Sequence, residues 1–167
     1  MIMFGWKKKK TATAIQVKAP LSGKAVPLSE VPDEAFAAGH MGKGIAIEPS
    51  EGRLIAPFDG TVAHVIKTKH AVMLEDPATG LQYLFHIGIN TVGLKGEGYT
   101  SHVNVGDSVK AGQTLIEFDI EAIKAAGYPT VTPIIVTNAD ELSASVEGHT
   151  GNVTAGTDPV LSITLNS

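Results

Sequence analysis

The chain has 167 residues, 43 % of them hydrophobic, which is enough apolar material for one domain with a substantial core. It contains no cysteine, and this excludes disulfides, thiolate metal sites and a cysteine nucleophile. The formal net charge is −4, but the first ten residues carry +4, so the remaining body carries −8 and has no basic stripe of the kind that binds nucleic acid.

The chain begins with a segment, residues 1–14, that we expect to be a flexible tail or a short amphipathic anchor. Phe4 and Trp6 precede Lys7–Lys10, a composition suited to weak contact of residues 1–10 with an anionic membrane surface. Secretory signals have the opposite order, and no run approaches the roughly 18 apolar residues of a membrane span. We therefore expect a cytoplasmic protein with its folded domain over 15–167.

The folded body has the texture of an all-β protein. Its 18 glycines and 9 prolines separate short Val, Ile and Leu runs, which predicts an antiparallel β-sandwich or barrel. Short helical turns are expected at Pro32–Ala38, Asp119–Ala126 and Asp140–Val146. Lys18–Val26 and Ile55–Ala63 share a pattern of strand, Ala-Pro, turn, Gly and strand, which indicates repeated corners within one domain.

Two histidines fall on one predicted hairpin. Its arms are Val65–Leu74 and Leu81–Asn90, joined by a Pro- and Gly-containing turn at Asp76–Gly80. Folding the arms about the middle of this turn places His70 directly opposite His86. Opposite residues of an antiparallel pair point to the same face, with Cβ atoms about 5 Å apart. The pairing therefore predicts two imidazoles in contact.

Paired imidazoles indicate either a phosphohistidine site or a metal site. Zinc needs at least three protein ligands in a catalytic site, and His70 with His86 supplies two. A zinc ion at this pair would therefore need a carboxylate from a partner protein. Thr68 precedes His70 by two residues, and its hydroxyl is better placed to hydrogen-bond an imidazole than to attack a substrate. No Gly-x-Ser-x-Gly motif is present to suggest a hydrolase.

Around the histidines the chain resembles a known family. The stretches Thr68–Ala71, Leu84–Val92 and Leu94–Tyr99 are similar to those of the glucose-type IIA component of the bacterial phosphoenolpyruvate-dependent sugar phosphotransferase system. Ala19–Gly23, Ala56–Thr61 and several other stretches extend the resemblance over residues 15–165.

The resemblance implies an antiparallel β-sandwich and a phosphocarrier that requires no cofactor. His86 matches the phosphoacceptor, which receives a phosphoryl group from the phosphocarrier HPr and passes it to a cysteine of the IIB domain of a sugar permease. His70 matches the second active-site histidine, which positions and stabilises the transferring group. Thr68 matches the residue that hydrogen-bonds this second histidine. An alternative is a regulatory binding protein that acts through its phosphorylation state.

A surface around the pair would receive the protein partners. We expect four apolar residues on it: Ile45, Val72, Leu84 and Val92. Lys43 and Asn90 stand where the family usually has Asp, and the resemblance implies that both lie beside the site. These two replacements would make the surroundings of the phosphoryl group less negative.

Overall fold

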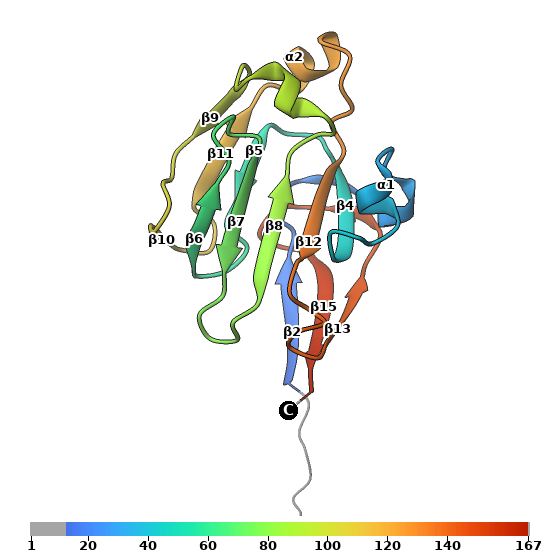
Figure 1. Ribbon diagram of the computed structural model, residues 1–167, viewed down its shortest axis with the longest axis vertical. Coiled ribbons are helices and arrows are strands. Elements are labelled where there is room, and N and C mark those ends of the chain that lie inside the picture. The colour runs from blue at the N-terminus through green and yellow to red at the C-terminus, as the bar shows by residue number, and fades with distance from the viewer. Residues whose placement is uncertain (1–12, 167) are drawn as a thin grey trace, which may run out of the picture.

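The computed structural model describes residues 13–166, which form three antiparallel sheets (Figure 1). One sheet has eight strands, in the spatial order β10 (Ser108–Val109), β6 (Gly60–Val65), β7 (Ala71–Glu75), β8 (Gln82–His86), β12 (Thr132–Val136), β4 (Lys43–Pro49), β3 (Gly23–Val26) and β14 (Gly151–Val153). The two smaller sheets are β5 (Arg53–Ile55), β11 (Thr114–Phe118), β9 (Tyr99–Ser101) and β13 (Ala144–Gly148), β15 (Pro159–Leu165), β2 (Thr13–Lys18). The all-β sandwich expected from the sequence is therefore confirmed.

Apolar side chains on alternate positions divide between the two faces of the eight-stranded sheet. Tyr83 and Phe85 of β8 lie in the main core, which the two smaller sheets share. Leu84, between them, lies on the opposite face in a second cluster with Phe36. Period-two alternation explains this division, because neighbouring residues of a strand point to opposite faces. Both faces of the sheet are thus covered near β8.

Short helices cover the second cluster and one end of the sandwich. The 3-10 helix η1 (Leu28–Glu30) and α1 (Glu34–Ala37) cover the outer face, while η2 (Thr91–Leu94) and α2 (Ile120–Ala125) lie at the upper end in Figure 1. The Asp119 carboxylate caps α2 by accepting from the Ala122 N–H at 3.0 Å, and Gly127 follows with a φ of 89°. No described helix has the length and apolar character for a membrane span.

The sequence predicted two further features of the backbone, with different outcomes. The helical turn at Pro32–Ala38 is confirmed as α1, with its N-cap at Asp33. A helical turn at Asp140–Val146 was wrong: residues 137–143 form hydrogen-bonded turns, and β13 begins at Ala144. Strand β13 pairs with β15 along its whole length, so sheet formation overrides the local preference here.

The repeated Ala-Pro segments form equivalent corners. Each carries the chain from a smaller sheet into the eight-stranded sheet, from β2 to β3 and from β5 to β6. Ala19 exchanges two backbone hydrogen bonds with the turn at 156–158, and Ala56 exchanges two with the turn at 112–113, all 2.8–2.9 Å long. The short sequence similarity thus reflects repeated packing within one domain.

Two predictions concern the N-terminal segment. The membrane contact proposed for residues 1–10 lies outside the described residues. The body was expected to start near Ile15, and β2 begins two residues earlier at Thr13, where it pairs with Leu165 of β15.

Candidate functional site

The two predicted histidines lie together at one end of the eight-stranded sheet. His86 is the last residue of β8, and His70 immediately precedes β7. Their ring centroids are 4.8 Å apart and the rings meet edge to face, at 77°. The contact between imidazoles that the sequence predicted is therefore present.

The register of the hairpin differs from the predicted one by one residue. His86 pairs with Ala71, because the connection Pro77–Gly80 has an even number of residues and its centre falls between two residues. The predicted first arm is also divided. Lys69 adopts a φ of 65°, which closes a tight turn between β6 and β7, and Ile66 N–H donates to Ala71 O at 3.0 Å across it. His70 therefore leaves this turn instead of lying within a strand.

The backbone holds the His86 ring in one orientation. Its Nδ1 lies 2.8 Å from the carbonyl oxygen of Gly88. A carbonyl only accepts, so this bond places the ring proton on Nδ1 and leaves the lone pair on Nε2. Gly88 has a φ of 80°, the left-handed conformation that glycine adopts without strain. The sharp turn after β8 thus fixes the tautomer of His86 and leaves its Nε2 without a proton.

His70 is more deeply buried than His86, with only 3 % of its surface exposed. Its Nδ1 lies 2.8 Å from the hydroxyl of Thr68, which is the contact expected for that threonine. When the hydroxyl donates, the proton of the His70 ring resides on Nε2 and is free to donate to an anion. The main chain joins the two histidines as well, since Ile87 N–H donates to His70 O at 2.7 Å.

Burial keeps both imidazoles neutral. It lowers the pKa of His70 to about 4, and the neighbouring His86 adds to this shift. Burial also lowers the pKa of His86, although the hydrogen bond to Gly88 and the negative charge of Asp33 oppose the shift. A neutral imidazole is the nucleophilic form, so each ring keeps a free lone pair at neutral pH.

The lowered pKa of His70 predicts a pH-dependent stability. Below about pH 6.5 residue 70 becomes protonated in the unfolded chain, whereas in the folded protein it stays neutral until about pH 4. The free energy of unfolding therefore falls as the pH decreases toward 4. This histidine should account for up to about 3 kcal/mol of that loss. Urea unfolding between pH 7 and 4 should give a flatter profile for His70→Asn. His64→Asn, at an exposed position of β6, should keep the wild-type dependence of stability on pH. Equal pH profiles for all three proteins would contradict the prediction.

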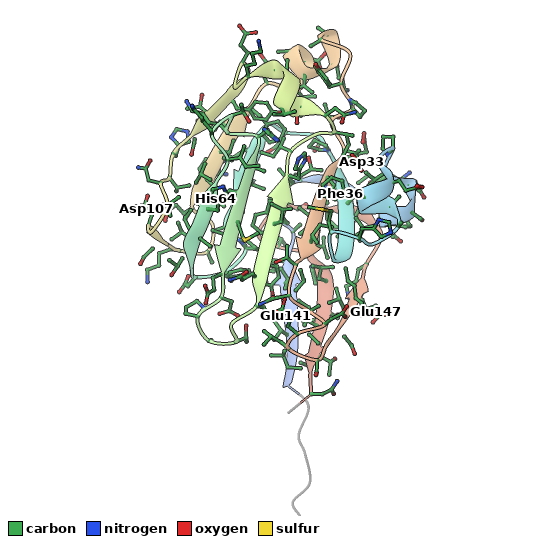
Figure 2. The ribbon with its side chains drawn as sticks, viewed as in Figure 1. Asp33, Phe36, His64, Asp107, Glu141 and Glu147 are labelled. Atoms are coloured by element: carbon green, nitrogen blue, oxygen red, sulfur yellow. The ribbon has the colours of Figure 1, made fainter. Side chains whose placement is uncertain are left out.

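Two residues next to His86 were missed by the sequence reasoning. Phe36 of α1 lies 5.1 Å from the His86 ring, centroid to centroid, and Asp33 is close enough to affect the pKa of His86 (Figure 2). Asp33 also caps α1, because its carboxylate accepts from Ala35 N–H at 2.9 Å. Strand β12 pairs with both β8 and β4, and the helix that precedes β4 is thereby brought to the site.

A buried tyrosine stabilises the turn that orients His86. Tyr99 donates its hydroxyl to Ile87 O at 3.0 Å, and the Thr91 hydroxyl donates to the same carbonyl at 2.7 Å. The Tyr99 ring also lies 6.4 Å from the His70 ring. The Ile87 peptide between the two histidines is therefore held at both its N–H and its C=O.

A second buried tyrosine offers a matched comparison. The hydroxyl of Tyr83 is buried and has no hydrogen-bond partner among residues 13–166. We expect Tyr99→Phe to lower the free energy of unfolding by about 1 kcal/mol, because it removes a buried hydrogen bond. Tyr83→Phe removes only an unsatisfied hydroxyl and should leave stability unchanged or raised. Urea unfolding of both variants checks this, and an equal loss in the two would show that the Ile87 contact contributes nothing.

The expected partner surface is only partly present. Leu84 lies on the same sheet face as His86, and Val92 of η2 is 58 % exposed. Ile45 and Val72 were wrong as surface residues, because each is 1 % exposed and packs in the main core. Both point to the inner face of the sheet, whereas His86 points to the outer one.

Asn90 and Lys43, which stand where the family usually has Asp, lie in different parts of the structure. Asn90 is the exposed N-cap of η2 and has a φ of 62°, which Asn tolerates better than most residues. Lys43 was wrong as a neighbour of the histidines. In the register of the sheet it is level with Tyr83, about 10 Å along the strands from His86. Its ammonium instead lies 3.1 Å from the carboxylate of Asp140.

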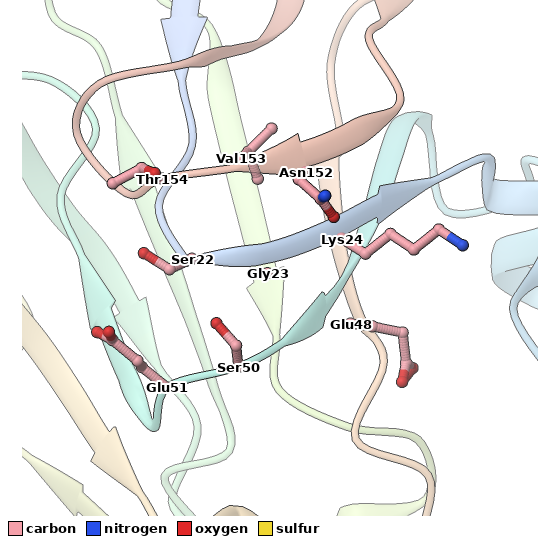
Figure 3. Close-up of a pocket in the computed structure, with 9 residues that line it drawn as sticks. All are labelled: Ser22, Gly23, Lys24, Glu48, Ser50, Glu51, Asn152, Val153 and Thr154. Atoms are coloured by element: carbon pink, nitrogen blue, oxygen red, sulfur yellow. The ribbon is translucent and has the colours of Figure 1, made fainter.

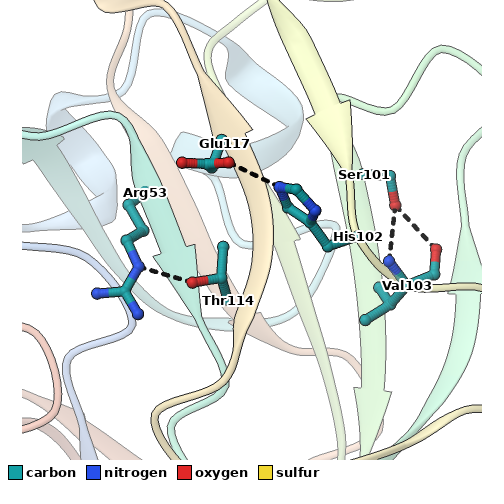
Figure 4. Close-up of polar contacts among 6 residues, drawn as sticks. All are labelled: Arg53, Ser101, His102, Val103, Thr114 and Glu117. Carbon is teal, nitrogen blue, oxygen red and sulfur yellow. Dashed lines mark hydrogen bonds and ion pairs between the residues drawn. The ribbon is translucent and has the colours of Figure 1, made fainter.

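Other polar groups of the described residues are poorer candidates for a site. No group of three or more His, Asp or Glu side chains is arranged to hold a metal ion within residues 13–166. His102 pairs with Glu117 of β11 at 2.7 Å, beside Arg53 and Thr114, but this pair is exposed (Figure 4). A hollow of about 500 Å³ lies at β3, β4 and β14, open to solvent and lined by Lys24, Glu48, Glu51 and shorter side chains (Figure 3).

Comparison with known proteins identifies the family of this chain. A family model described as the phosphoenolpyruvate-dependent sugar phosphotransferase system, EIIA 1, matches residues 15–142. The chain belongs to this EIIA family. Membership gives it a phosphotransfer role in sugar transport, consistent with a neutral imidazole pair.

Individual relatives of this EIIA protein agree with the assignment. The glucose-specific EIIA component from Oceanobacillus iheyensis is 42 % identical over 156 residues, 93 % of this chain and 94 % of that protein. The beta-glucoside-specific EIIBCA component from Bacillus subtilis is 47 % identical over 137 residues, 82 % of this chain but only 22 % of that protein. The solved structure of glucose permease IIA from Mycoplasma capricolum superposes with a TM-score of 0.79 at 33 % identity, covering 90 % of this chain and 96 % of that one.

Proposed function

We propose that this EIIA protein accepts a phosphoryl group from the phosphocarrier HPr on Nε2 of His86 and passes it to a cysteine of the IIB domain of a sugar permease, in the cytoplasm. One observation carries the proposal. The His86 ring donates Nδ1–H to Gly88 O, which leaves Nε2 as the nucleophile next to a second, neutral imidazole. In the first step the Nε2–P bond forms as the bond to the donor breaks. In the second the cysteine, as its thiolate, attacks phosphorus: the S–P bond forms as the Nε2–P bond breaks, the electron pair of that bond returns to Nε2, and Nδ1 keeps its proton throughout.

His70 and Thr68 are proposed as the residues that stabilise the transferring group. Phosphoryl transfer depends mainly on positioning and on donors aimed at the phosphoryl oxygens. The Thr68 hydroxyl, 2.8 Å from Nδ1 of His70, favours the tautomer whose Nε2–H donates. Because His70 is buried and its pKa is low, it would donate as a neutral imidazole. Such a group stabilises the transition state without trapping the phosphorylated form as an ion pair.

The surroundings of His86 suit docking of protein partners in turn. A shallow apolar groove of about 190 Å³ is lined by Ile66, Met73 and Leu84 and by Ala71, the residue that pairs with His86. Its small volume and apolar lining suit side chains of a docked protein better than a free sugar. The IIB domain as acceptor is further supported by relatives, such as the Bacillus subtilis EIIBCA component, whose names join EIIA to EIIB and EIIC.

No cofactor is needed for this transfer. His70 and His86 would supply zinc with two nitrogen ligands, and a partner carboxylate would have to complete the site, as the sequence suggested. Zinc bound in this way would occupy the Nε2 lone pair of His86 and compete with the phosphoryl group.

The test is phosphorylation of the purified protein by phosphoenolpyruvate, enzyme I and HPr. We expect one acid-labile phosphate per chain, located on His86 by mass spectrometry, and its transfer to a purified IIB domain. A glucose-type EIIA from another bacterium, incubated with the same carriers, shows that they are active. If that protein is phosphorylated and this one is not, a phosphocarrier role is wrong and a regulatory binding role replaces it.

A further inference from the structure

One side of the histidine pair is acidic. Glu30 of η1 and Glu34 of α1 are exposed, and Asp33 between them affects the pKa of His86. Residues 25–39 contain these three acids and no Lys or Arg. Because Phe36 of the same helix contacts the His86 ring, this acidic side directly borders the site.

The other side of the pair is basic. Lys67 and Lys69 are exposed in the β6–β7 turn, on either side of Thr68, and residues 61–71 contain no Asp or Glu. Lys95 extends this side, because a Cβ placed on the next residue, Gly96, would lie 3.6 Å from Thr68 O. Glu97, two residues after Lys95, is the one acidic residue close to Lys95 in the sequence. The segments that hold His70 thus bring three lysines together.

None of these charges is neutralised within the described part of the chain. Its ion pairs are Lys43 with Asp140 and His102 with Glu117, both away from the histidines. Exposed charges without internal partners remain available to another protein. Their effect falls mainly on the rate of encounter and on the choice of partner, more than on the lifetime of the complex.

From this arrangement we infer that the docking surface is electrically two-sided and selects proteins whose own surface is basic opposite η1 and α1 and acidic opposite the β6–β7 turn. The inference deepens the proposed function. His86 must face its phosphoryl donor and its acceptor in turn, so both partners dock between the same two groups of charges. Both therefore carry this pattern of complementary charge.

Charge reversal on each side tests the inference. The variants are Lys67→Glu with Lys69→Glu on the basic side and Glu30→Lys with Glu34→Lys on the acidic side. We expect each double variant to lower kcat/KM about 3- to 10-fold in 50 mM NaCl, both for transfer from phospho-HPr and for transfer to a purified IIB domain. In 500 mM NaCl the differences from wild type should largely disappear, because salt screens exposed charges.

Matched reversals far from the site serve as controls. The basic control is Lys18→Glu with Lys110→Glu, two positions near the start of β6 and away from the β6–β7 turn. The acidic control is Glu141→Lys with Glu147→Lys, two positions in the lower half of the molecule in Figure 2. These should keep wild-type rates within about twofold. The inference is overturned if reversal on either side leaves transfer unchanged or faster, or if only one of the two transfer steps responds. Failure of the proposed function is a separate result, because wild type would then gain no phosphate from HPr.

Discussion

Replacing His86 by alanine is expected to abolish phosphorylation of the protein. The His70→Ala variant should still be phosphorylated but fail to transfer the phosphoryl group to the IIB domain. The reason lies in the partners of the two rings. His86 donates Nδ1–H to a carbonyl and is partly exposed, so its Nε2 is the free nucleophile. His70 is almost fully buried and bonded to a hydroxyl, which suits it to donate to a phosphoryl oxygen.

The measurement follows phosphate on the protein and its transfer to the IIB domain separately. We expect no incorporation for His86→Ala and one phosphate for His70→Ala, with onward transfer slowed at least about 100-fold, the scale of a lost transition-state donor. Far-UV circular dichroism shows whether each variant is folded. Phosphate uptake by His86→Ala, or its complete loss in His70→Ala alone, would reverse the assignment.

Thr68→Val tests whether the tautomer of the His70 ring affects transfer while the ring itself is kept. Valine keeps the shape of threonine but removes the hydroxyl 2.8 Å from Nδ1 of His70. Both tautomers of the ring then become accessible, and only one presents Nε2–H. Onward transfer should therefore slow by about tenfold while phosphate uptake stays close to wild type. An unchanged rate would show that the hydroxyl has no effect on the tautomer.

Features set by local sequence were predictable. The Pro77 to Gly80 turn identified the hairpin, and Asp119 and Gly127 identified both ends of α2. The pairing of His70 and His86 was recognised as well, although the register was one residue off. That error did not separate the rings, because His70 lies in the tight turn before β7, where its ring still reaches the face of His86.

Features set by pairing between distant strands were not predictable. Phe36 and Lys43 are seven residues apart, yet one contacts His86 and the other lies about 10 Å along the sheet from its level. Ile45 was predicted to lie on the apolar surface that receives the partners. Its position on β4 turns it to the inner face, and only the order of strands in the sheet reveals this.

Gly88→Ala tests whether the turn after β8 prepares His86 for reaction. A Cβ on Gly88 would lie 2.6 Å from the Thr91 methyl group and 3.0 Å from Pro129 O, in a backbone with a φ of 80°. The left-handed conformation alone costs alanine about 1–2 kcal/mol. Relief of the clash would move the Gly88 carbonyl away from Nδ1 of His86. We expect a total loss of about 3 kcal/mol in stability.

Gly127→Ala is the matched control, because Gly127 has a φ of 89° and nothing within 4 Å of an added Cβ. It should show the strain of the left-handed conformation alone, with phosphate uptake unchanged. Gly88→Ala should also slow uptake at least about tenfold, since small displacements of a reacting group are costly in phosphoryl transfer. Urea unfolding and the rate of phosphorylation by HPr measure the two effects. If both variants lose the same stability and keep the same rate, the carbonyl of Gly88 does not orient the phosphoacceptor.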